Sequence, residues 1–166
     1  MGSSEWEELL ERRLALLPGS RDPGGGPLLV VPLSPDPANH DLGGISATLK
    51  YLKTIPSSSC RDRGWVVVVD ARNCPYRLVK PTVSTVRAAL GNIRYLFIVR
   101  PEGFWEKQRV DCRKSQVDSQ PIYISSTKLF RYLEVTQLPD SLGGTLKYNH
   151  ESWIRRRKVI KNKNNN

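Results

Sequence analysis

The run Trp-Val-Val-Val-Val-Asp at Trp65–Asp70 constrains the fold more than any other feature of the sequence. A continuous apolar run this rich in β-branched residues is typical of a strand buried on both faces, in the middle of a parallel or mixed sheet. A second apolar run, Tyr95–Val99, follows a segment over 76–90 whose apolar residues have helical spacing. Two such strands joined by a helix predict a right-handed βαβ unit. We therefore expect a single α/β domain.

Weaker signals of the same kind occupy the rest of the chain. Ser4–Leu17 has the spacing of an amphipathic helix, with a capping box at its start and Pro18-Gly19 at its end. Pro81 is expected to kink the helix over 76–90 or to delay its start. We expect further strands at Leu28–Leu33 and Ile122–Ser125. We also expect helices over Leu42–Leu52 and Thr127–Leu133, and a last helix from about Asn149 into the basic end.

Positive charge is concentrated at the end of the chain. The 166 residues carry a formal net charge of +10, and residues 155–166 hold six Lys or Arg and no acid, so the remainder carries only +4. The predicted organisation is a lead-in helix over 1–18, an α/β domain over 19–154 and a basic Asn/Lys-rich tail or linker over 155–166. A basic chain favours anionic partners such as acidic lipid surfaces or nucleic acid. No pattern typical of an RNA-binding or helix-turn-helix domain is present, which argues against nucleic acid.

Several classes of protein and of site are not supported by the sequence. No apolar run approaches the roughly 18 residues of a membrane-spanning helix, and the first residues lack the pattern of a secretory signal, so we expect a cytoplasmic protein. Three widely spaced cysteines, Cys60, Cys74 and Cys112, fit reduced thiols. With only two histidines and no paired-ligand spacing, no metal site is predicted.

No catalytic motif is recognisable, so we expect a protein that is not an enzyme and has no cofactor. Glycine-rich phosphate-binding loops and a nucleophile elbow are absent from the sequence. Asp70 ends its predicted strand, where α/β folds place ligand-binding residues. A helix cap or an ion pair with Arg72 is the favoured interpretation of that carboxylate. His40 and His150 have no recognisable Ser or Cys nucleophile to activate.

Two basic segments are candidates for contact with a membrane. In Arg100–Arg109, the aromatic residues Phe104 and Trp105 lie among Arg100, Lys107 and Arg109, which would suit a lipid interface as well as a loop anchored by two buried rings. The second is the polybasic run Arg155, Arg156, Arg157 and Lys158, which favours either an acidic membrane surface, a solvated helix end or a linker.

A resemblance to a known family sharpens this picture. The run Leu-Pro-Asp-Ser-Leu-Gly-Gly-Thr-Leu at 138–146 resembles the closing signature of CRAL-TRIO lipid-binding domains, with Leu142 in place of the usual aromatic. The chain is also similar, over roughly residues 19–157, to the branch found in Trio- and kalirin-type Rho guanine-nucleotide exchange factors and their spectrin-repeat relatives. The stretches that carry this similarity are Gly25–Pro32, Tyr51–Pro56, Arg63–Arg72, Arg100–Arg109 and Leu146–Ile154.

The resemblance implies a mixed, mostly parallel sheet floored by helices, with an apolar pocket or groove. It implies a phosphoinositide or other anionic phospholipid as ligand and a regulatory role in a larger signalling protein that is peripheral on membranes. The headgroup would be held by Lys80, Arg100, Lys107 and Arg109, with Phe104 and Trp105 at the gate of the pocket and the polybasic run 155–158 as an auxiliary surface.

One departure from the family bears on what the domain could do with a lipid. The larger lipid-transfer members have a long gate, whereas Pro101–Gln120 is short and implies a shallow groove that binds at a surface rather than transfers lipid. The alternative hypothesis is a protein-interaction or autoinhibitory domain with a collapsed pocket and no lipid ligand. An enzyme that uses Asp70 is a remote third.

Overall fold

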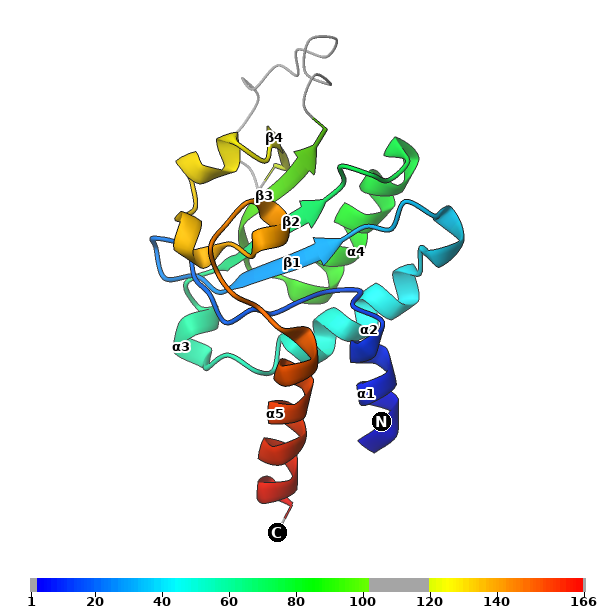
Figure 1. Cartoon of the computed structure of the whole chain (residues 1–166), viewed down its shortest axis with the longest axis vertical. Coiled ribbons are helices and arrows are strands. Elements are labelled where there is room, and N and C mark those ends of the chain that lie inside the picture. Colours follow the sequence, from blue (N-terminus) through cyan, green and yellow to red (C-terminus); the bar gives the residue numbers. More distant parts are fainter. Residues whose placement is uncertain (1–2, 102–119, 166) are drawn as a thin grey trace.

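A four-stranded parallel sheet forms the centre of the molecule (Figure 1). The computed structural model describes residues 3–101 and 120–165. The sheet has the order β1-β2-β3-β4, with bounds Leu28–Pro32, Trp65–Asp70, Ile93–Arg100 and Ile122–Ser125. Every pair of neighbouring strands is parallel. The α/β prediction is confirmed, and among the described strands the sheet is parallel throughout rather than mixed.

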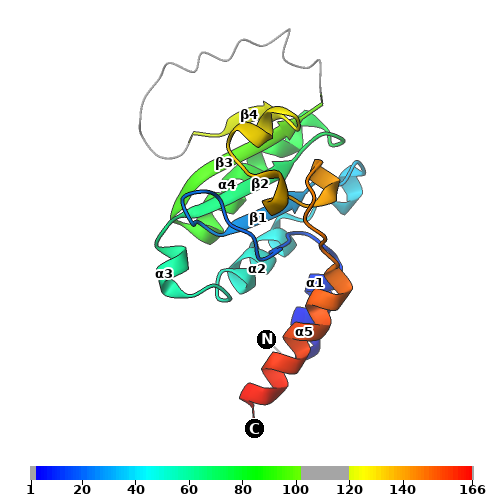
Figure 2. The same cartoon turned by 60° about the vertical axis from the view of Figure 1, so that its left-hand side comes forward.

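Two helices cover one face of this sheet. α2 (Leu42–Leu52) joins β1 to β2, and α4 (Val79–Leu90) joins β2 to β3. Because successive strands are neighbours and their crossovers have one hand, both helices lie on the same side (Figures 1 and 2). Pro81 delays α4, as predicted, since it is the third residue of the helix, where a backbone N–H would have no acceptor within the helix.

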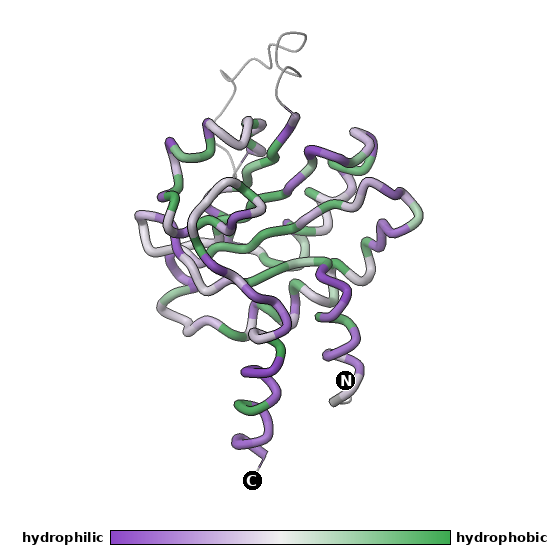
Figure 3. Tube along the Cα trace, in the orientation of Figure 1, coloured by the Kyte–Doolittle hydropathy of each residue, from purple (hydrophilic) through white to green (hydrophobic). Residues whose placement is uncertain are grey.

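The strands bury alternate residues in two separate cores. On β2, Val67 and Val69 face the helices, whereas Val66 and Val68 face the other side, and all four are 0% exposed. A strand places successive side chains on opposite faces, so burial of the whole run requires a cover on each face. Figure 3 shows the resulting concentration of hydrophobic residues along the central strands.

Irregular turns supply the second cover. 3-10 turns at Lys128–Arg131 (η4), Val135–Gln137 (η5) and Asp140–Leu142 (η6) cross the face opposite α2 and α4. The predicted helix over Thr127–Leu133 is therefore only a short turn. These turns place four leucines against the sheet, each at most 2% exposed: Leu129, Leu133, Leu138 and Leu142.

The Gly-Gly pair closes the turn region through a tight backbone approach. The amide of Leu146 donates to the carbonyl of Leu138 at 3.0 Å, and the amide of Gly144 donates to that of Pro139 at 3.0 Å. Gly143 has a φ of +83°, which an L side chain rarely adopts. A Cβ on Gly144 would lie only 1.9 Å from the Leu138 carbonyl oxygen. The signature run at 138–146 thus serves a packing function in this fold.

The first helix is shorter than predicted. α1 spans Ser3–Glu11 and does not continue to Leu17. Arg13 turns the chain with a φ of 55°, after which Leu16 and Val30 exchange two backbone hydrogen bonds of 2.7 and 2.9 Å. This antiparallel bridge supplies partners for the backbone N–H and C=O groups of Val30 at the outer edge of β1. If α1 continued as a helix, it would leave these groups unpaired.

The last helix, α5 (His150–Asn164), packs beside α1 (Figures 1 and 2). The carbonyl of Leu10 lies 2.6 Å from Nε2 of His150, and the Tyr148 hydroxyl lies 2.5 Å from Nδ1. Because a carbonyl can only accept, the neutral imidazole donates from Nε2 and accepts from Tyr148 at Nδ1. Residues 155–164, expected to be a tail or linker, form the larger part of this helix, and Lys158 and Lys161 also contact the body of the domain.

We predict that Gly144→Ala lowers the free energy of unfolding by about 1–3 kcal/mol, because the new methyl group must displace the backbone of Leu138. The matched control is Gly43→Ala in α2, where the nearest heavy atom to an added Cβ is 3.5 Å away. That variant should be unchanged, or up to about 1 kcal/mol more stable because alanine favours helix. Urea unfolding of both variants measures the difference, and equal stability would contradict the close approach.

His150 should make stability depend on pH. Burial lowers the pKa of His150 from its ordinary value of 6.5. As the pH is lowered from 7 to 5, the unfolded chain therefore binds a proton that the folded chain excludes. The free energy of unfolding consequently decreases by up to about 1.4 kcal/mol for each unit by which the pH is lowered. His150→Gln should be less stable than wild type at pH 8 and should lose this component of the slope. Parallel curves for the two proteins would contradict the assignment.

Candidate anion-binding groove

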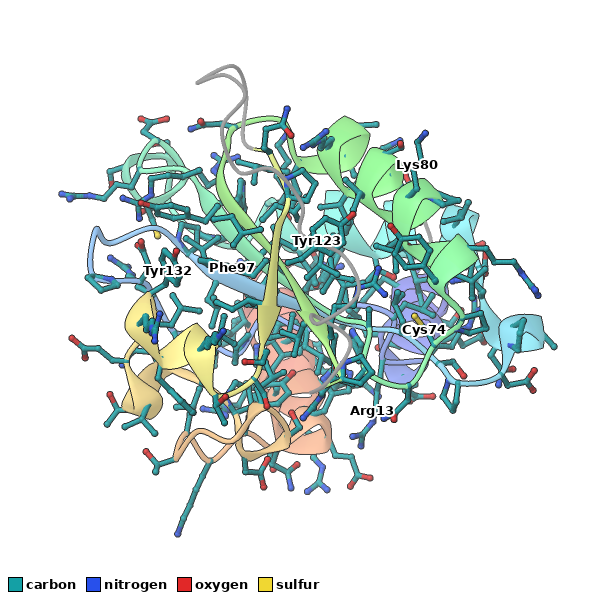
Figure 4. The ribbon with its side chains drawn as sticks, turned by 90° about the horizontal axis from the view of Figure 1, so that it is seen from above. Arg13, Cys74, Lys80, Phe97, Tyr123 and Tyr132 are labelled. Carbon is teal, nitrogen blue, oxygen red and sulfur yellow. The ribbon has the colours of Figure 1, made fainter. Side chains whose placement is uncertain are left out.

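A groove of about 460 Å³ lies between α4 and the edge strand β4. Its cationic residues are Arg77, Lys80 and Arg87, all exposed. Lys80, Ser84 and Arg87 are spaced by four and three residues, so α4 presents them on one side. Among the described residues, the rest of the wall is aromatic or apolar and comprises Tyr76, Val79, Val83, Pro121 and Tyr123. Figure 4 shows Lys80 on α4 and Tyr123 on β4.

Arg100 supports the tyrosines of this groove from within. It ends β3 and is only 4% exposed. Its guanidinium carbon lies 4.0 Å from the ring centroid of Tyr76 and 5.3 Å from that of Tyr123. Such cation–π contacts strengthen when they are shielded from water. Arg100 therefore places a fixed positive charge beneath the aromatic part of the groove.

Burial and neighbouring charges shift the pKa of both Arg100 and Tyr123. Burial lowers the pKa of Arg100, but an arginine remains protonated at physiological pH. Burial, followed by the neighbouring Tyr76, raises the pKa of Tyr123 above its usual value, while the positive charges of Arg100 and Arg87 act in the opposite sense. At neutral pH the Tyr123 hydroxyl consequently stays protonated beside the positive charge of Arg100, which suits an anionic ligand.

The headgroup residues expected from the resemblance have different locations. Lys80 lines the groove, and Arg100 lies behind its tyrosines rather than facing solvent. The predictions for Phe104, Trp105, Lys107 and Arg109 fall outside the described residues. Sequence reasoning missed two arginines of the groove, Arg77 and Arg87. The helical spacing of basic residues after position 76 is the signal that could have indicated them.

The predicted auxiliary patch at 155–158 lies far from the groove. Its residues belong to α5, whose C-terminal end and β4 are at opposite ends of the long axis of the molecule (Figure 1). Nζ of Lys158 pairs with a carboxylate oxygen of Glu7 at 2.9 Å, while Arg155 lies 3.8 Å from Glu151. Arg156 is exposed and Arg157 is partly buried. The two basic regions are thus separate surfaces.

Asp70 forms the ion pair that the sequence suggested. Both of its carboxylate oxygens accept hydrogen bonds of 2.9 Å from the guanidinium of Arg72, which also donates to the carbonyl of Ser141 at 2.6 Å. The interpretation of Asp70 as a partner for Arg72 is confirmed. The pair links the end of β2 to the turns that cover the second core.

Over 3–101 and 120–165, no group of three or more His, Cys, Asp or Glu is placed to hold a metal ion. In the same part of the chain, none of the helices has the length and hydrophobicity needed to cross a bilayer.

Comparison with known proteins gives relatives that cover most of this chain. The human protein "SEC14 domain and spectrin repeat-containing protein 1" is 34% identical over 157 residues, which cover 92% of this chain and 22% of that protein. The Xenopus tropicalis protein of the same name is equally similar, at 34% over 157 residues. The chain is homologous to SEC14-domain proteins. It spans about a fifth of the length of these relatives, 22%.

Exchange factors are also among the relatives. The human "Probable guanine nucleotide exchange factor MCF2L2" is 31% identical over 163 residues, which cover 93% of this chain and 15% of that protein. The rat "Guanine nucleotide exchange factor DBS" is 28% identical over 166 residues, covering 95% of this chain and 14% of that protein. No family model matches the chain. The relatives are consistent with a CRAL-TRIO-type domain, and the narrower assignment to the Trio branch stays a prediction.

Arg100→Lys should test the support beneath the groove. Lysine keeps the charge but loses the planar group that stacks on both tyrosine rings, so we expect a loss of about 1–2 kcal/mol in the free energy of unfolding. Arg77→Lys, an exposed position in the same groove, is the matched control and should change stability by less than about 0.5 kcal/mol. Urea unfolding measures both. Equal effects would argue against a structural role for the guanidinium.

Proposed function

We propose that this chain is a non-enzymatic module that binds an anionic phospholipid, with a phosphoinositide as the preferred ligand, at cytoplasmic membrane faces. The observation that carries the proposal is the groove between α4 and β4, which Arg77, Lys80 and Arg87 line together with two tyrosine rings. Phosphate groups are bound by such cations through charge-assisted hydrogen bonds. No cofactor forms part of the proposal.

The two kinds of wall suit the two parts of a phosphoinositide headgroup. Arginine and lysine side chains on α4 would pair with phosphate oxygens. The rings of Tyr76 and Tyr123 would contact the faces of the inositol ring, and Tyr76 is already 52% exposed. The buried charge of Arg100 beneath both rings adds a favourable field for an anion without requiring direct contact. The predicted ligands Lys107 and Arg109 would extend this set.

The size of the groove favours a headgroup over a whole lipid. About 460 Å³ falls within the range of sites for small molecules, and two acyl chains would need far more space. Acyl chains would then stay in the bilayer while the headgroup occupies the groove. This arrangement agrees with surface binding rather than lipid transfer.

The relatives support a place in a larger signalling protein. Their names include a SEC14 domain, spectrin repeats and guanine nucleotide exchange factors. On that basis, we propose that the domain targets or regulates a parent protein, in the first instance a Rho guanine-nucleotide exchange factor. Its spectrin-repeat or exchange-factor domains would be the partners within the parent.

One observation favours a second candidate, a protein-interaction or autoinhibitory domain without a lipid ligand. Leucines from the turns at 128–142 fill the face of the sheet opposite the helices, and each is at most 2% exposed. The described part of that face therefore has the packing of a solid core. A collapsed pocket of this kind is what the second candidate requires.

Sedimentation with phosphatidylcholine vesicles, with and without a phosphoinositide, distinguishes these possibilities. The groove variant is Arg77→Glu/Lys80→Glu, and the matched control is Lys50→Glu/Lys147→Glu, which makes the same change in net charge at exposed positions outside the groove. We expect the groove variant to bind at least about tenfold more weakly, since each basic residue near an acidic surface contributes about 1 kcal/mol. The control should bind as wild type does.

Two further variants locate any remaining binding. Lys107→Glu/Arg109→Glu tests the predicted ligands outside the described residues, and Arg155→Glu/Arg156→Glu tests the auxiliary patch on α5. Equal losses in all four variants would indicate attraction by net charge alone. The proposal would be overturned in favour of the second candidate if the wild type did not bind the vesicles, or if it bound them equally with and without the phosphoinositide.

A further inference from the structure

The outward side of α5 combines exposed apolar residues with positive charge. Val159 and Ile160 are 54% and 45% exposed, although both are aliphatic. Arg156 precedes Val159 by three positions, and Lys163 follows Ile160 by three, so the four residues occupy successive turns of one helix face. We call this face, made of Arg156, Val159, Ile160 and Lys163, the α5 stripe.

The opposite side of the helix is already occupied. Ile154 is 5% exposed, and Lys158 pairs with Glu7 of α1. Nζ of Lys161 lies 4.1 Å from the ring centroid of Trp6 in α1 and 4.8 Å from that of Tyr51 in α2. Each residue of a helix advances by about 100°, which puts these three contacts nearly opposite the stripe. The body of the domain therefore holds α5 in place and leaves the stripe facing solvent.

We propose that the α5 stripe is a docking surface for an acidic amphipathic helix of a protein partner. The helix carries six Lys or Arg and a single acid, Glu151, over its 15 residues. A partner helix with two neighbouring apolar residues between carboxylates would cover Val159 and Ile160 and would pair with Arg156 and Lys163. The four residues of the stripe are three or four positions apart across successive turns, so one partner helix can contact them all.

A membrane is a poorer match for the same surface. A helix that lies in a bilayer interface needs a broad apolar face, and the stripe has only two apolar residues. The C-terminal end of α5 also points away from β4, beside which the groove is formed (Figures 1 and 2). A flat bilayer that contacts the groove would leave the stripe free for a protein. The inference stands independently of the lipid proposed for the groove.

The test uses the whole chain and a synthetic probe. The probe is a fluorescent helical peptide with leucine pairs flanked by glutamates on one face, and its comparison is a shuffled peptide of identical composition without that face. Fluorescence anisotropy gives the dissociation constants. We expect the amphipathic peptide to bind at least about tenfold more tightly than the shuffled one, because only its leucines can cover the apolar pair.

Variants separate the apolar contribution from the charge. Val159→Ser/Ile160→Ser should weaken binding of the amphipathic peptide by about tenfold or more and leave that of the shuffled peptide unchanged. Arg156→Glu/Lys163→Glu should weaken both. Lys50→Glu/Lys147→Glu is the control for net charge and should preserve the difference between the peptides. All three variants change exposed residues, and thermal unfolding checks that the fold is retained.

Three outcomes would overturn the inference. Equal affinity for the two peptides would reduce the stripe to unspecific charge attraction. Insensitivity of the amphipathic peptide to Val159→Ser/Ile160→Ser would place its binding elsewhere. Binding of phosphatidylcholine–phosphatidylserine vesicles that is lost on Val159→Ser/Ile160→Ser, together with no peptide preference, would assign the stripe to a membrane. Failure of the groove variants to affect vesicles would bear only on the proposed function.

Discussion

Burial of β2 on both faces is the constraint on which the rest of the molecule depends. Four valines with no exposed surface leave water on neither side of the strand, so the chain must supply two covers. Helices α2 and α4 provide one of them. The second consists of turns, and its leucines are held by the close backbone approach at Gly144 and by the bridge from Asp70 through Arg72 to Ser141. Removal of either cover would expose half of the strand.

The same architecture creates the groove at the edge of the sheet. Because β4 is short and lies at the edge, the space between it and α4 is only partly filled by apolar side chains. Tyr76 and Tyr123 close this space from two elements, and Arg100 reaches them from the end of β3. A charge that would be costly in an apolar core is tolerated there, since two aromatic faces replace part of its hydration.

Two basic surfaces of the described chain lie apart. One is the groove beside β4, and the other is the outward face of α5 at the opposite end of the molecule (Figure 1). Since screening limits exposed charges to about 8–10 Å at physiological salt, each surface would act independently on the partner proposed for it. A domain of this shape could contact a membrane at one end and a protein at the other, which is a useful geometry within a larger signalling protein.

The pattern of the sequence was enough to predict the sheet and the helices on one of its faces, whereas the turns on the other face and the sites depend on contacts between distant segments. The valine run, the second apolar strand and the helical spacing between them were enough to predict an α/β sheet with a covered β2, because burial on two faces leaves a pattern that is local in sequence. Asp70 and Arg72 are near neighbours in the sequence, so their ion pair could also be predicted from it. The residue at which α1 ends could not be predicted from the sequence. It depends on the edge of β1, which pairs with Leu16 only in the folded chain. Nor could sequence place Arg100 beneath two tyrosines that lie 24 and 23 positions away from it, or show that Lys158 is paired while Val159 is exposed. Those facts depend on contacts between distant segments, and only the packed structure specifies them.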